Sequence, residues 1–236
     1  MAQKRGRRYE AAVKSYQTVF RDALPHGLVV GVTLPIEPGV PEEVIARLHP
    51  DERVHLGGLL GLRQVTFAGG RIAARGALQA LGRPVGAILP DERGAPMVPP
   101  GIGLSISHKA TLAIALACRV EDQTVGVDLE DLLPARPGIE ERVLRPEEQS
   151  AILEQPPERR WTSTLLRFSI KESIYKALAP RLGRYIDFHE AEVWPRADGV
   201  AEVKLHLVSG SPPVSLDARF CWLPEAVITS VRARWS

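Results

Sequence analysis

Residues 167–178 read RFSIKESIYKAL, and this stretch decides how the second half of the chain is expected to fold. Placed on a helix, it continues an apolar stripe about 120° wide, which is enough to bury against a sheet. The stripe is formed by Leu166, Ile170, Ile174, Ala177 and Leu178. Glu172 and Lys176 lie four residues apart on the far side. The helix alone leaves two interpretations open: an exposed ion pair worth about 0.3–0.5 kcal/mol, or charges held toward a ligand.

Around this helix, the chain predicts helices followed by strands, twice over. In the first half we expect a strand, two helices, a turn and three strands that form an antiparallel meander, at 27–35, 41–49, 62–81, 87–100, 103–108, 111–119 and 124–131. In the second half we expect two helices and four strands, at 146–154, 159–179, 191–195, 201–208, 214–223 and 226–234. This order is typical of an α+β fold.

The two halves also match each other weakly. A shift of 101 residues places Arg75 on Lys176 and residues 81–83 on residues 182–184. Both stretches belong to the long helix of their half. Chance can produce so short a match, but it is in keeping with two related lobes.

Composition excludes several classes of protein. The chain has 236 residues, of which 44% are hydrophobic and 25% charged, as is ordinary for a soluble globular protein. A net charge of +2 argues against a dedicated nucleic-acid binder. The longest apolar run, LAIALAC at 112–118, is far shorter than the roughly 20 residues that span a bilayer. We therefore expect neither nucleic-acid binding nor membrane insertion.

The N-terminus and the cysteines bear on location. MAQKRGRRYE at 1–10 is basic, but no apolar segment follows it, so we do not expect a secretory signal. The run is either a solvated tail or a patch that docks a partner. Cys118 and Cys221 form no ligand cluster, and we interpret them as reduced thiols of a cytoplasmic protein.

The strand expected at 124–131 carries two acids. Side chains alternate along a strand, so Asp128 and Glu130 share one face while Val127 and Leu129 share the other. Adjacent carboxylates repel, and a folded protein tolerates them with a cation or a shared proton. Oxygen ligands of this kind suit Mg²⁺. The alternative is an exposed strand with solvated acids.

Cations precede this strand. His108 follows the short strand at 103–108, and Arg63, Arg71 and Arg75 lie on the helix expected at 62–81. Guanidinium groups suit phosphate, although a solvated basic face and a turn histidine are the plainer interpretations. The chain has no nucleophile elbow and no glycine-rich phosphate loop. Acids for a metal and cations for phosphates indicate an enzyme that positions a phosphoanhydride for attack by a substrate hydroxyl.

Three motifs in order carry a resemblance: SISH at 105–108, GVDLE at 126–130 and FSIKESIYKAL at 168–178. Together they resemble the 4′-phosphopantetheinyl transferases, in the two-lobed type of the enterobactin-synthetase-associated branch. Residues 67–82 and 182–193 resemble that branch as well. The similarity covers roughly residues 60–195.

The resemblance implies an α+β pseudodimer of two similar lobes, each an antiparallel sheet packed with a long helix, with the active site in the cleft between them. Residues 1–125 would form the lobe on the phosphoadenosine side of coenzyme A, and residues 126–236 the lobe with the metal acids. The implied reaction moves 4′-phosphopantetheine from coenzyme A to a serine of an apo acyl or peptidyl carrier protein. It uses Mg²⁺ and releases adenosine 3′,5′-bisphosphate. We expect a monomer that serves siderophore, nonribosomal-peptide and polyketide synthesis.

The resemblance also assigns residues on the metal side. Asp128, Glu130 and Glu172 match the family's Mg²⁺ ligands. Glu172 is also the candidate general base, acting on the carrier serine directly or through a water on the metal. A carboxylate shared with Mg²⁺ is a weak base, so the alternative is that the metal makes the serine hydroxyl acidic. Lys176 matches a family lysine that stabilises charge on the leaving group.

Other matches concern coenzyme A. Lys171 and Lys176 match lysines near its phosphates, His108 matches a contact to the 3′-phosphate, and Arg63 and Arg71 match arginines on the phosphoadenosine side. Arg75 is a weaker match. Some relatives carry a lysine where this chain has Ala95, so Arg93, Pro96 or backbone groups would serve the adenine.

Two other functions fit parts of the pattern. Acids beside a lysine also suit a Mg²⁺-dependent phosphodiesterase or nuclease, which would call for a strong excess of basic residues. A non-enzymatic scaffold that binds carrier domains would be expected to have lost the acids or the lysines, and this sequence retains both.

Overall fold

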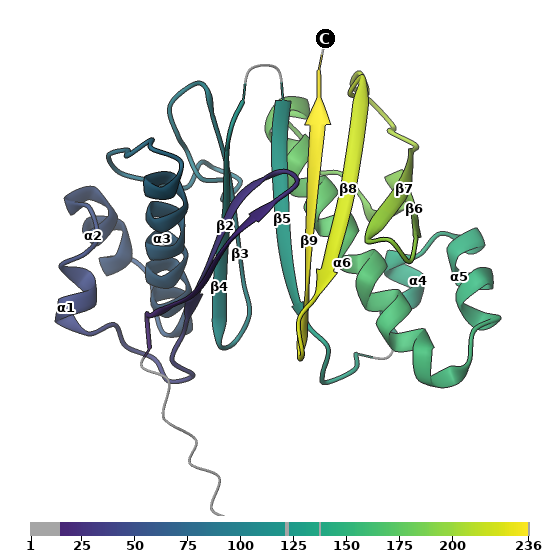
Figure 1. Cartoon of the computed structure of the whole chain (residues 1–236), viewed down its shortest axis with the longest axis horizontal. Helices are drawn as coiled ribbons and strands as arrows, with labels where there is room; N and C mark the ends of the chain where they lie inside the picture. The colour runs from purple at the N-terminus through teal and green to yellow at the C-terminus, as the bar shows by residue number, and fades with distance from the viewer. Residues whose placement is uncertain (1–14, 121–122, 137, 236) are drawn as a thin grey trace, which may run out of the picture.

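The computed structural model describes residues 15–120, 123–136 and 138–235. The basic run at 1–10, with its two interpretations, lies outside these residues. Two antiparallel sheets stand side by side, and each has helices on its outer side (Figure 1). Within the described residues, no helix is long and apolar enough to cross a membrane.

The first sheet has the order β1-β2-β4-β3. Its strands are β1 (Thr18–Leu24), β2 (Gly27–Thr33), β3 (Ile102–His108) and β4 (Leu112–Arg119). The long helix α3 (Leu62–Ala80) packs on it, preceded by the short helices α1 (Glu42–Ile45) and α2 (Pro50–Gly57). Alanines 113, 115 and 117 of β4 line the core beneath α3, because small side chains let the helix lie close to the strand.

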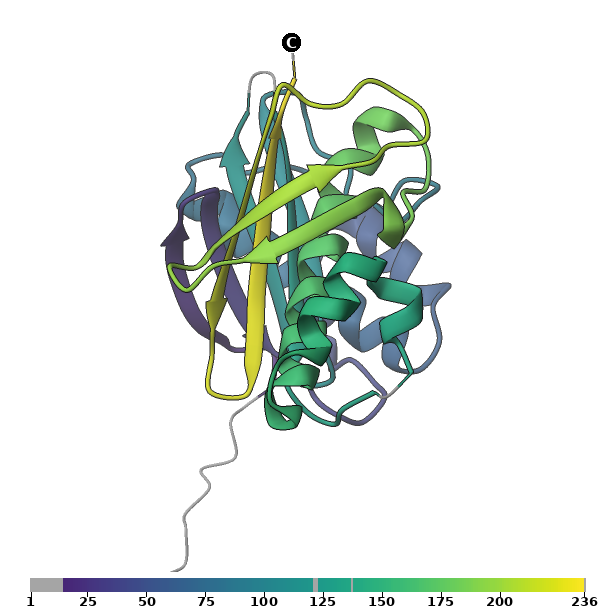
Figure 2. The ribbon, with the colours of Figure 1, turned by 90° about the vertical axis from the view of Figure 1, so that its right-hand side faces the viewer.

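The second sheet has the order β5-β9-β8-β7-β6. Its strands are β5 (Gln123–Asp131), β6 (Ala191–Pro195), β7 (Val200–Leu205), β8 (Ser215–Trp222) and β9 (Ala226–Arg234). The helix α6 (Pro157–Leu182) covers it, and α4 (Glu140–Val143) and α5 (Pro146–Leu153) pack beside α6 (Figure 2). A 3₁₀ turn, η1 (Phe188–Glu190), leads into β6.

A third apolar cluster lies between the two sheets. Ile114 and Leu116 of β4 meet Val127 and Leu129 of β5 there, and all four side chains are fully buried. The layers therefore run helix, sheet, sheet, helix. The predicted alternation along β5 is confirmed, since its apolar side chains face the other sheet and the opposite face is left for α6.

The predicted meander is wrong in its third strand. β3 pairs with β4, but β5 pairs with β9 of the second sheet along its whole length, from Gln123 opposite Arg234 to Asp131 opposite Ala226. Alternation of side chains predicts a strand without naming its neighbour, which explains the error. The boundary expected between residues 125 and 126 falls inside β5. A boundary placed before β5 would leave this strand whole, with the rest of its sheet, in the second lobe.

The apolar stripe of α6 is buried as predicted, with Ile170, Ile174 and Leu178 almost inaccessible. The helix lies so close to β5 that a Cβ added at Gly126 would stand 2.0 Å from the carbonyl oxygen of Ser173. A backbone atom cannot move aside as a side chain can. Glycine at this position therefore sets the distance between α6 and β5.

The two lobes share one topology. In the first, β2, α3, β3 and β4 follow in sequence and the strands lie in the order β2-β4-β3; in the second, β5, α6, β8 and β9 lie in the order β5-β9-β8. Both long helices end at a left-handed glycine, Gly82 with φ 69° and Gly183 with φ 66°. The expected α+β architecture of two similar lobes is thus confirmed.

Candidate active site between the two lobes

Two serines join the lobes where the edges of the sheets meet. The hydroxyls of Ser105 and Ser107 on β3 accept hydrogen bonds from the backbone N–H groups of Val127 (2.9 Å) and Leu129 (3.3 Å) on β5. Side chains here replace a backbone ladder between neighbouring strands. Sequence reasoning used SISH only for its histidine, although the two-residue spacing of its serines was a signal that both point to one side.

Asp128 is the centre of a buried polar cluster that draws on three elements. Its Oδ1 accepts hydrogen bonds from Ser107 Oγ (2.9 Å) and Lys176 Nζ (2.8 Å), and its Oδ2 accepts one from Ser169 Oγ (2.9 Å). Lys176 Nζ also donates to Ser107 Oγ and to the carbonyl oxygen of Val127, both at 3.0 Å. The lysine of α6 therefore ties together β3 and β5, which the exposed-pair interpretation of the helix does not allow.

Glu130 lies on the same face of β5 and holds two cations of its own. Lys109 Nζ lies 2.7 Å from one carboxylate oxygen and Arg136 Nη2 lies 2.7 Å from the other. The Glu130 side chain is 4% exposed, so the interpretation of solvated acids is wrong. Burial, followed by the charge of Asp128, raises the pKa of Glu130 despite these cations. Sequence reasoning missed both Lys109 and Arg136.

Glu172 is half-buried on α6 and close enough to both acids of β5 to interact with them electrostatically. Burial raises the pKa of its carboxyl, the negative charge of Asp128 adds to the rise, and Lys176 opposes it. Three carboxyl groups from β5 and α6 thus face one region. Ionisation of one carboxyl group disfavours ionisation of its neighbours, because like charges repel. A divalent cation bound among them would relieve this repulsion.

The donor set suits Mg²⁺ in its chemistry. Carboxylate oxygens are the ligands that this ion prefers, and it commonly takes one or two of them and fills its shell with water and substrate phosphates. Among the described residues, however, no three His, Cys, Asp or Glu side chains converge closely enough to hold a metal ion by themselves.

Three of the five residues predicted to meet coenzyme A line one cavity of about 260 Å³. Arg63, Arg71 and His108 line it, together with His55 and Phe67. The Arg71 guanidinium lies 4.2 Å above the Phe67 ring, and its Nε donates to the carbonyl oxygen of Ile88 at 2.6 Å. These contacts fix the orientation of Arg71 before any ligand arrives. Two side chains of α3, about two helix turns apart, and one at the end of β3 therefore lie on the same cavity.

Charge in this cavity comes from the arginines. Burial lowers the pKa of Arg71 to about 10, which leaves it cationic at neutral pH. Burial also lowers the pKa of His108, and the nearby positive charges of Lys176 and Lys109 lower it further. At neutral pH His108 is therefore uncharged and can offer a hydrogen bond to an anion. The influence of Lys176 on His108 places this cavity next to the cluster around Asp128.

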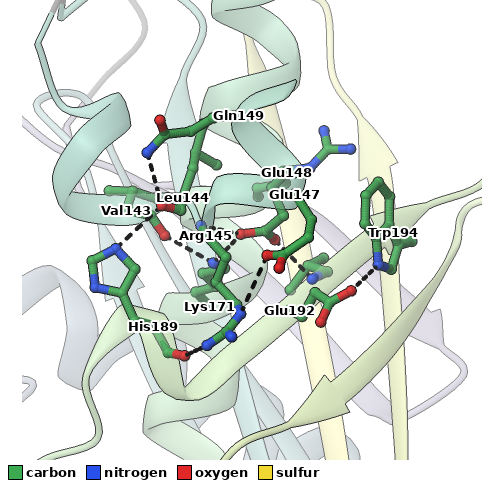
Figure 3. Close-up of polar contacts among 12 residues, drawn as sticks. Val143, Leu144, Arg145, Glu147, Glu148, Gln149, Lys171, His189, Glu192 and Trp194 are labelled. Carbon is green, nitrogen blue, oxygen red and sulfur yellow. Dashed lines mark hydrogen bonds and ion pairs between the residues drawn. The ribbon is translucent and has the colours of Figure 1, made fainter. Parts of the chain in front are cut away.

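Lys171 belongs neither to the cluster around Asp128 nor to the cavity lined by Arg63, Arg71 and His108. Its side chain is buried on another side of α6, where Nζ lies 2.6 Å from Glu148 Oε2 and donates to the carbonyl oxygen of Val143 at 2.8 Å (Figure 3). The predicted phosphate contact of Lys171 therefore does not fit this structure. Successive helical residues point about 100° apart, so Lys171 cannot follow its neighbour Glu172 into the cleft. Arg75 is engaged in the same way by Glu52 at 2.7 Å.

A second cavity, of about 330 Å³, opens between the lobes. It is lined by the turn at 91–96, by β3, by the start of β5 and by Tyr175 and Lys176 of α6. Arg93, one of the residues considered for the adenine, lines this cavity and donates from Nη2 to the carbonyl oxygen of Gly183 at 2.6 Å. This contact links the turn of the first lobe to the end of α6 across the cleft.

Two family models match the chain. The 4′-phosphopantetheinyl transferase superfamily model matches residues 124–222, and the 4′-phosphopantetheinyl transferase N-terminal domain model matches residues 60–118. The first match begins with β5 and the second ends within β4. The two models thus follow the two lobes of the structure.

Among curated proteins, the 4′-phosphopantetheinyl transferase Npt of Nocardia iowensis is 33% identical over 213 residues, which are 81% of this chain and 90% of that protein. The transferase Svp of Streptomyces mobaraensis is 35% identical over 157 residues, 65% of this chain and 63% of that protein. Enterobactin synthase component D of Salmonella typhimurium is 34% identical over 126 residues, about half of each chain. A holo-(acyl-carrier-protein) synthase of Bacillus anthracis, solved with coenzyme A, matches 48% of this chain and 96% of its own at 20% identity and a TM-score of 0.40.

Proposed function

This chain belongs to the 4′-phosphopantetheinyl transferase family and is an enzyme of the transferase class, and from that premise we propose that it moves 4′-phosphopantetheine from coenzyme A to a serine of an apo acyl or peptidyl carrier protein. The reaction would need Mg²⁺ and would release adenosine 3′,5′-bisphosphate. The single observation that supports it best is the contact of Lys176 with Asp128 and Ser107, because it brings α6, β5 and β3 together beside a cavity lined by cations.

The anionic end of coenzyme A would bind in the cavity of the first lobe. Arg63 and Arg71 would meet its phosphates, and neutral His108 would donate a hydrogen bond to the 3′-phosphate. Guanidinium groups offer paired N–H donors that match phosphate oxygens. This assignment agrees with the expectation that residues 1–125 serve the phosphoadenosine side, and it leaves the pyrophosphate to reach toward Asp128.

Asp128, Glu130 and Glu172 would hold the metal ion together with substrate oxygens. Bound there, Mg²⁺ would supply positive charge against the pyrophosphate. Lys109, Arg136 and Lys176 pair with the acids of β5, so that the buried carboxylates are not left unpaired. Lys176, which is bound to Asp128 and Ser107, would also share its ammonium group with the substrate phosphates.

In the chemical step, the carrier serine oxygen attacks the phosphorus that bears the pantetheine arm. The bond from that phosphorus to the bridging pyrophosphate oxygen breaks, and the electron pair leaves with adenosine 3′,5′-bisphosphate. Glu172, which lies on α6 beside Asp128 and Lys176, would accept the serine proton. Lys176 would stabilise the charge that develops on the leaving group.

Intact-mass spectrometry tests this function. Apo acyl and apo peptidyl carrier proteins are incubated with the chain, coenzyme A and Mg²⁺, with and without EDTA. We expect each accepted carrier to gain one phosphopantetheine, and the gain to disappear with EDTA. No gain on any of several carriers, despite measured coenzyme A binding, would contradict transfer. Breakdown of coenzyme A without carrier modification would favour the phosphodiesterase instead.

The biological setting is part of the same proposal. The similarity to an enterobactin synthase component supports a role in siderophore synthesis, and the Streptomyces and Nocardia relatives fit peptide or polyketide synthesis. Cys118 and Cys221 are both free thiols, in keeping with a cytoplasmic protein. We expect a monomer, because the two similar lobes of one chain form both sides of the cleft; sedimentation analysis checks this.

A further inference from the structure

Two buried glutamates occupy the same place in the two lobes. Glu52 and Glu148 are each the third residue of a short helix that begins with proline, α2 at Pro50 and α5 at Pro146. Both side chains are 0% exposed. Each carboxylate accepts a hydrogen bond from the backbone N–H just ahead of its helix, from His49 at 3.0 Å and from Arg145 at 2.7 Å.

Each glutamate also binds two distant parts of its lobe. Glu52 accepts a hydrogen bond from the backbone N–H of Ile88 at 2.7 Å, and Glu148 accepts one from Val193 at 2.8 Å. Each then binds a cation of the long helix, Arg75 of α3 at 2.7 Å or Lys171 of α6 at 2.6 Å. A single carboxylate thus connects a short helix, a long helix and the segment that follows the long helix.

The positions of these residues show that the two arrangements correspond. The steps from Glu52 to Glu148 and from Arg75 to Lys171 are both 96 residues. Arg75 therefore corresponds to Lys171 and not to Lys176, which the shift of 101 residues suggested. That longer shift holds for the ends of the helices, at Gly82 and Gly183. After the matched cation, α3 continues only from Arg75 to Ala80, whereas α6 continues from Lys171 to Leu182. Glu172 and Lys176 lie in this longer part of α6.

We propose that Lys171 and Glu148 are a positioning pair that sets the rotation of α6, and that Lys171 does not contact coenzyme A. Lys171 is 2% exposed, so a phosphate cannot reach its ammonium group without displacing Glu148 or Val143. Figure 3 shows the lysine enclosed by the segment from Val143 to Glu148 and by β6. The proposal rests on the proposed function, because it concerns how Glu172 and Lys176 are presented to the cleft.

The rotation of α6 matters because of where its polar residues lie. Along the helix, Glu172 and Lys176 are turned by about 100° and 140° from Lys171. Anchoring Lys171 on one side therefore fixes the direction in which the other two project toward Asp128. The hydrogen bond and ion pair of Lys171 are directional, whereas the aliphatic contacts of the apolar stripe are not.

Three variants test the pair: Lys171→Met, Lys171→Arg, and Lys171→Met combined with Glu148→Gln. For each, kcat and KM for coenzyme A are measured with a saturating carrier, coenzyme A affinity is measured by calorimetry, and circular dichroism verifies folding at the assay temperature. Lys204→Met, an exposed lysine of β7, is the matched control.

We expect Lys171→Met to lower kcat at least about 10-fold, while the coenzyme A Kd changes less than about 2-fold. Lys171→Arg should keep kcat within about 3-fold of the unsubstituted protein, because arginine already fills the corresponding position in the first lobe. The double variant should lose no more activity than Lys171→Met alone, as residues of one pair are not additive. The control should match the unsubstituted protein.

Two results would overturn the inference. A coenzyme A Kd raised at least 10-fold by Lys171→Met, with kcat retained, would mean that Lys171 reaches the phosphates. An unchanged kcat in folded Lys171→Met protein with a lower melting temperature would mean that the pair serves stability alone. Failure of the proposed function would look different, because then the unsubstituted protein would modify no carrier.

Discussion

The long helices α3 and α6 occupy the same place in two lobes of the same topology, yet they differ in how they approach their sheets and in what they present to the cleft. α3 comes close to its sheet through its own glycines, Gly69, Gly70 and Gly76, each of which faces side-chain atoms of the sheet or a neighbouring loop. α6 carries no such glycines and comes close through Gly126 of the strand beneath it. Equal topology therefore does not require equal placement of small residues.

The functional side chains differ more. Arg63 and Arg71 of α3 line a cavity suited to phosphates, whereas Glu172 and Lys176 of α6 lie beside Asp128. The buried Glu–cation pairs are the part that both lobes share. If the proposed function holds, this repeated scaffold carries a binding surface in one copy and reacting groups in the other.

The largest effect is expected at the centre of the second lobe's cluster. Asp128→Ala should lower transfer at least about 10²-fold while leaving the fold intact, because it removes a proposed metal ligand and the carboxylate that orients Lys176. Carrier modification by intact mass and circular dichroism check this. Unchanged transfer at limiting Mg²⁺ would contradict the metal assignment.

A substitution in the first lobe should affect the binding of coenzyme A. Arg71→Met should raise KM for coenzyme A by about 10- to 100-fold and change kcat much less, because hydrogen bonds to a charged group contribute about 1.5–3 kcal/mol. Initial rates over a range of coenzyme A concentrations provide the measurement. If Arg71→Met lowered kcat instead and left KM unchanged, the division between a binding helix and a reacting helix would be lost.

The two modes of helix packing can be separated by stability. Gly126→Ala should destabilise the protein by about 1–3 kcal/mol, since the new Cβ meets backbone atoms of α6 at 2.0 and 2.8 Å. Gly76→Ala is the matched control in α3. Its Cβ would meet Val30 at 3.2 Å, a side chain that can shift, and alanine favours the helix by about 1 kcal/mol.

Urea unfolding of both variants measures these effects. We expect the midpoint of Gly126→Ala to fall clearly and that of Gly76→Ala to stay close to the unsubstituted protein. Equal losses in the two variants would mean that both helices are held at the same distance by the same kind of contact, contrary to the comparison.

The smallest effect concerns the segment after α6. There the Arg184 guanidinium holds the pKa of Glu190 at about 2, below the ordinary value of about 4.3 for glutamate. A lowered carboxyl pKa stabilises the fold above the unfolded pKa and loses this contribution as the pH falls toward 2. Glu190→Gln should therefore lower the melting temperature at pH 7 and make less difference at pH 3. A difference that grew toward low pH would contradict the pairing.

Much of the fold could be predicted from local patterns. The apolar stripe of α6 and the alternation of Val127 and Leu129 reflect the periods of helix and strand, which act over a few residues. The motifs singled out Arg63, Arg71 and His108, and their lying on one cavity is seen in the tertiary structure. The partner of β5 could not be predicted, because its apolar face would suit either sheet.

The sequence by itself determined that this chain is α+β and that Asp128 and Glu130 share a face, and it singled out acids, lysines and arginines as candidates for the site. Only the tertiary structure decided which of these charges meet. Lys171 and Lys176 are alike in type and five positions apart, yet one is buried against Glu148 and the other lies on Asp128. The physical reason is that a charge in the interior needs a partner from another element, and the partner is chosen by packing in three dimensions.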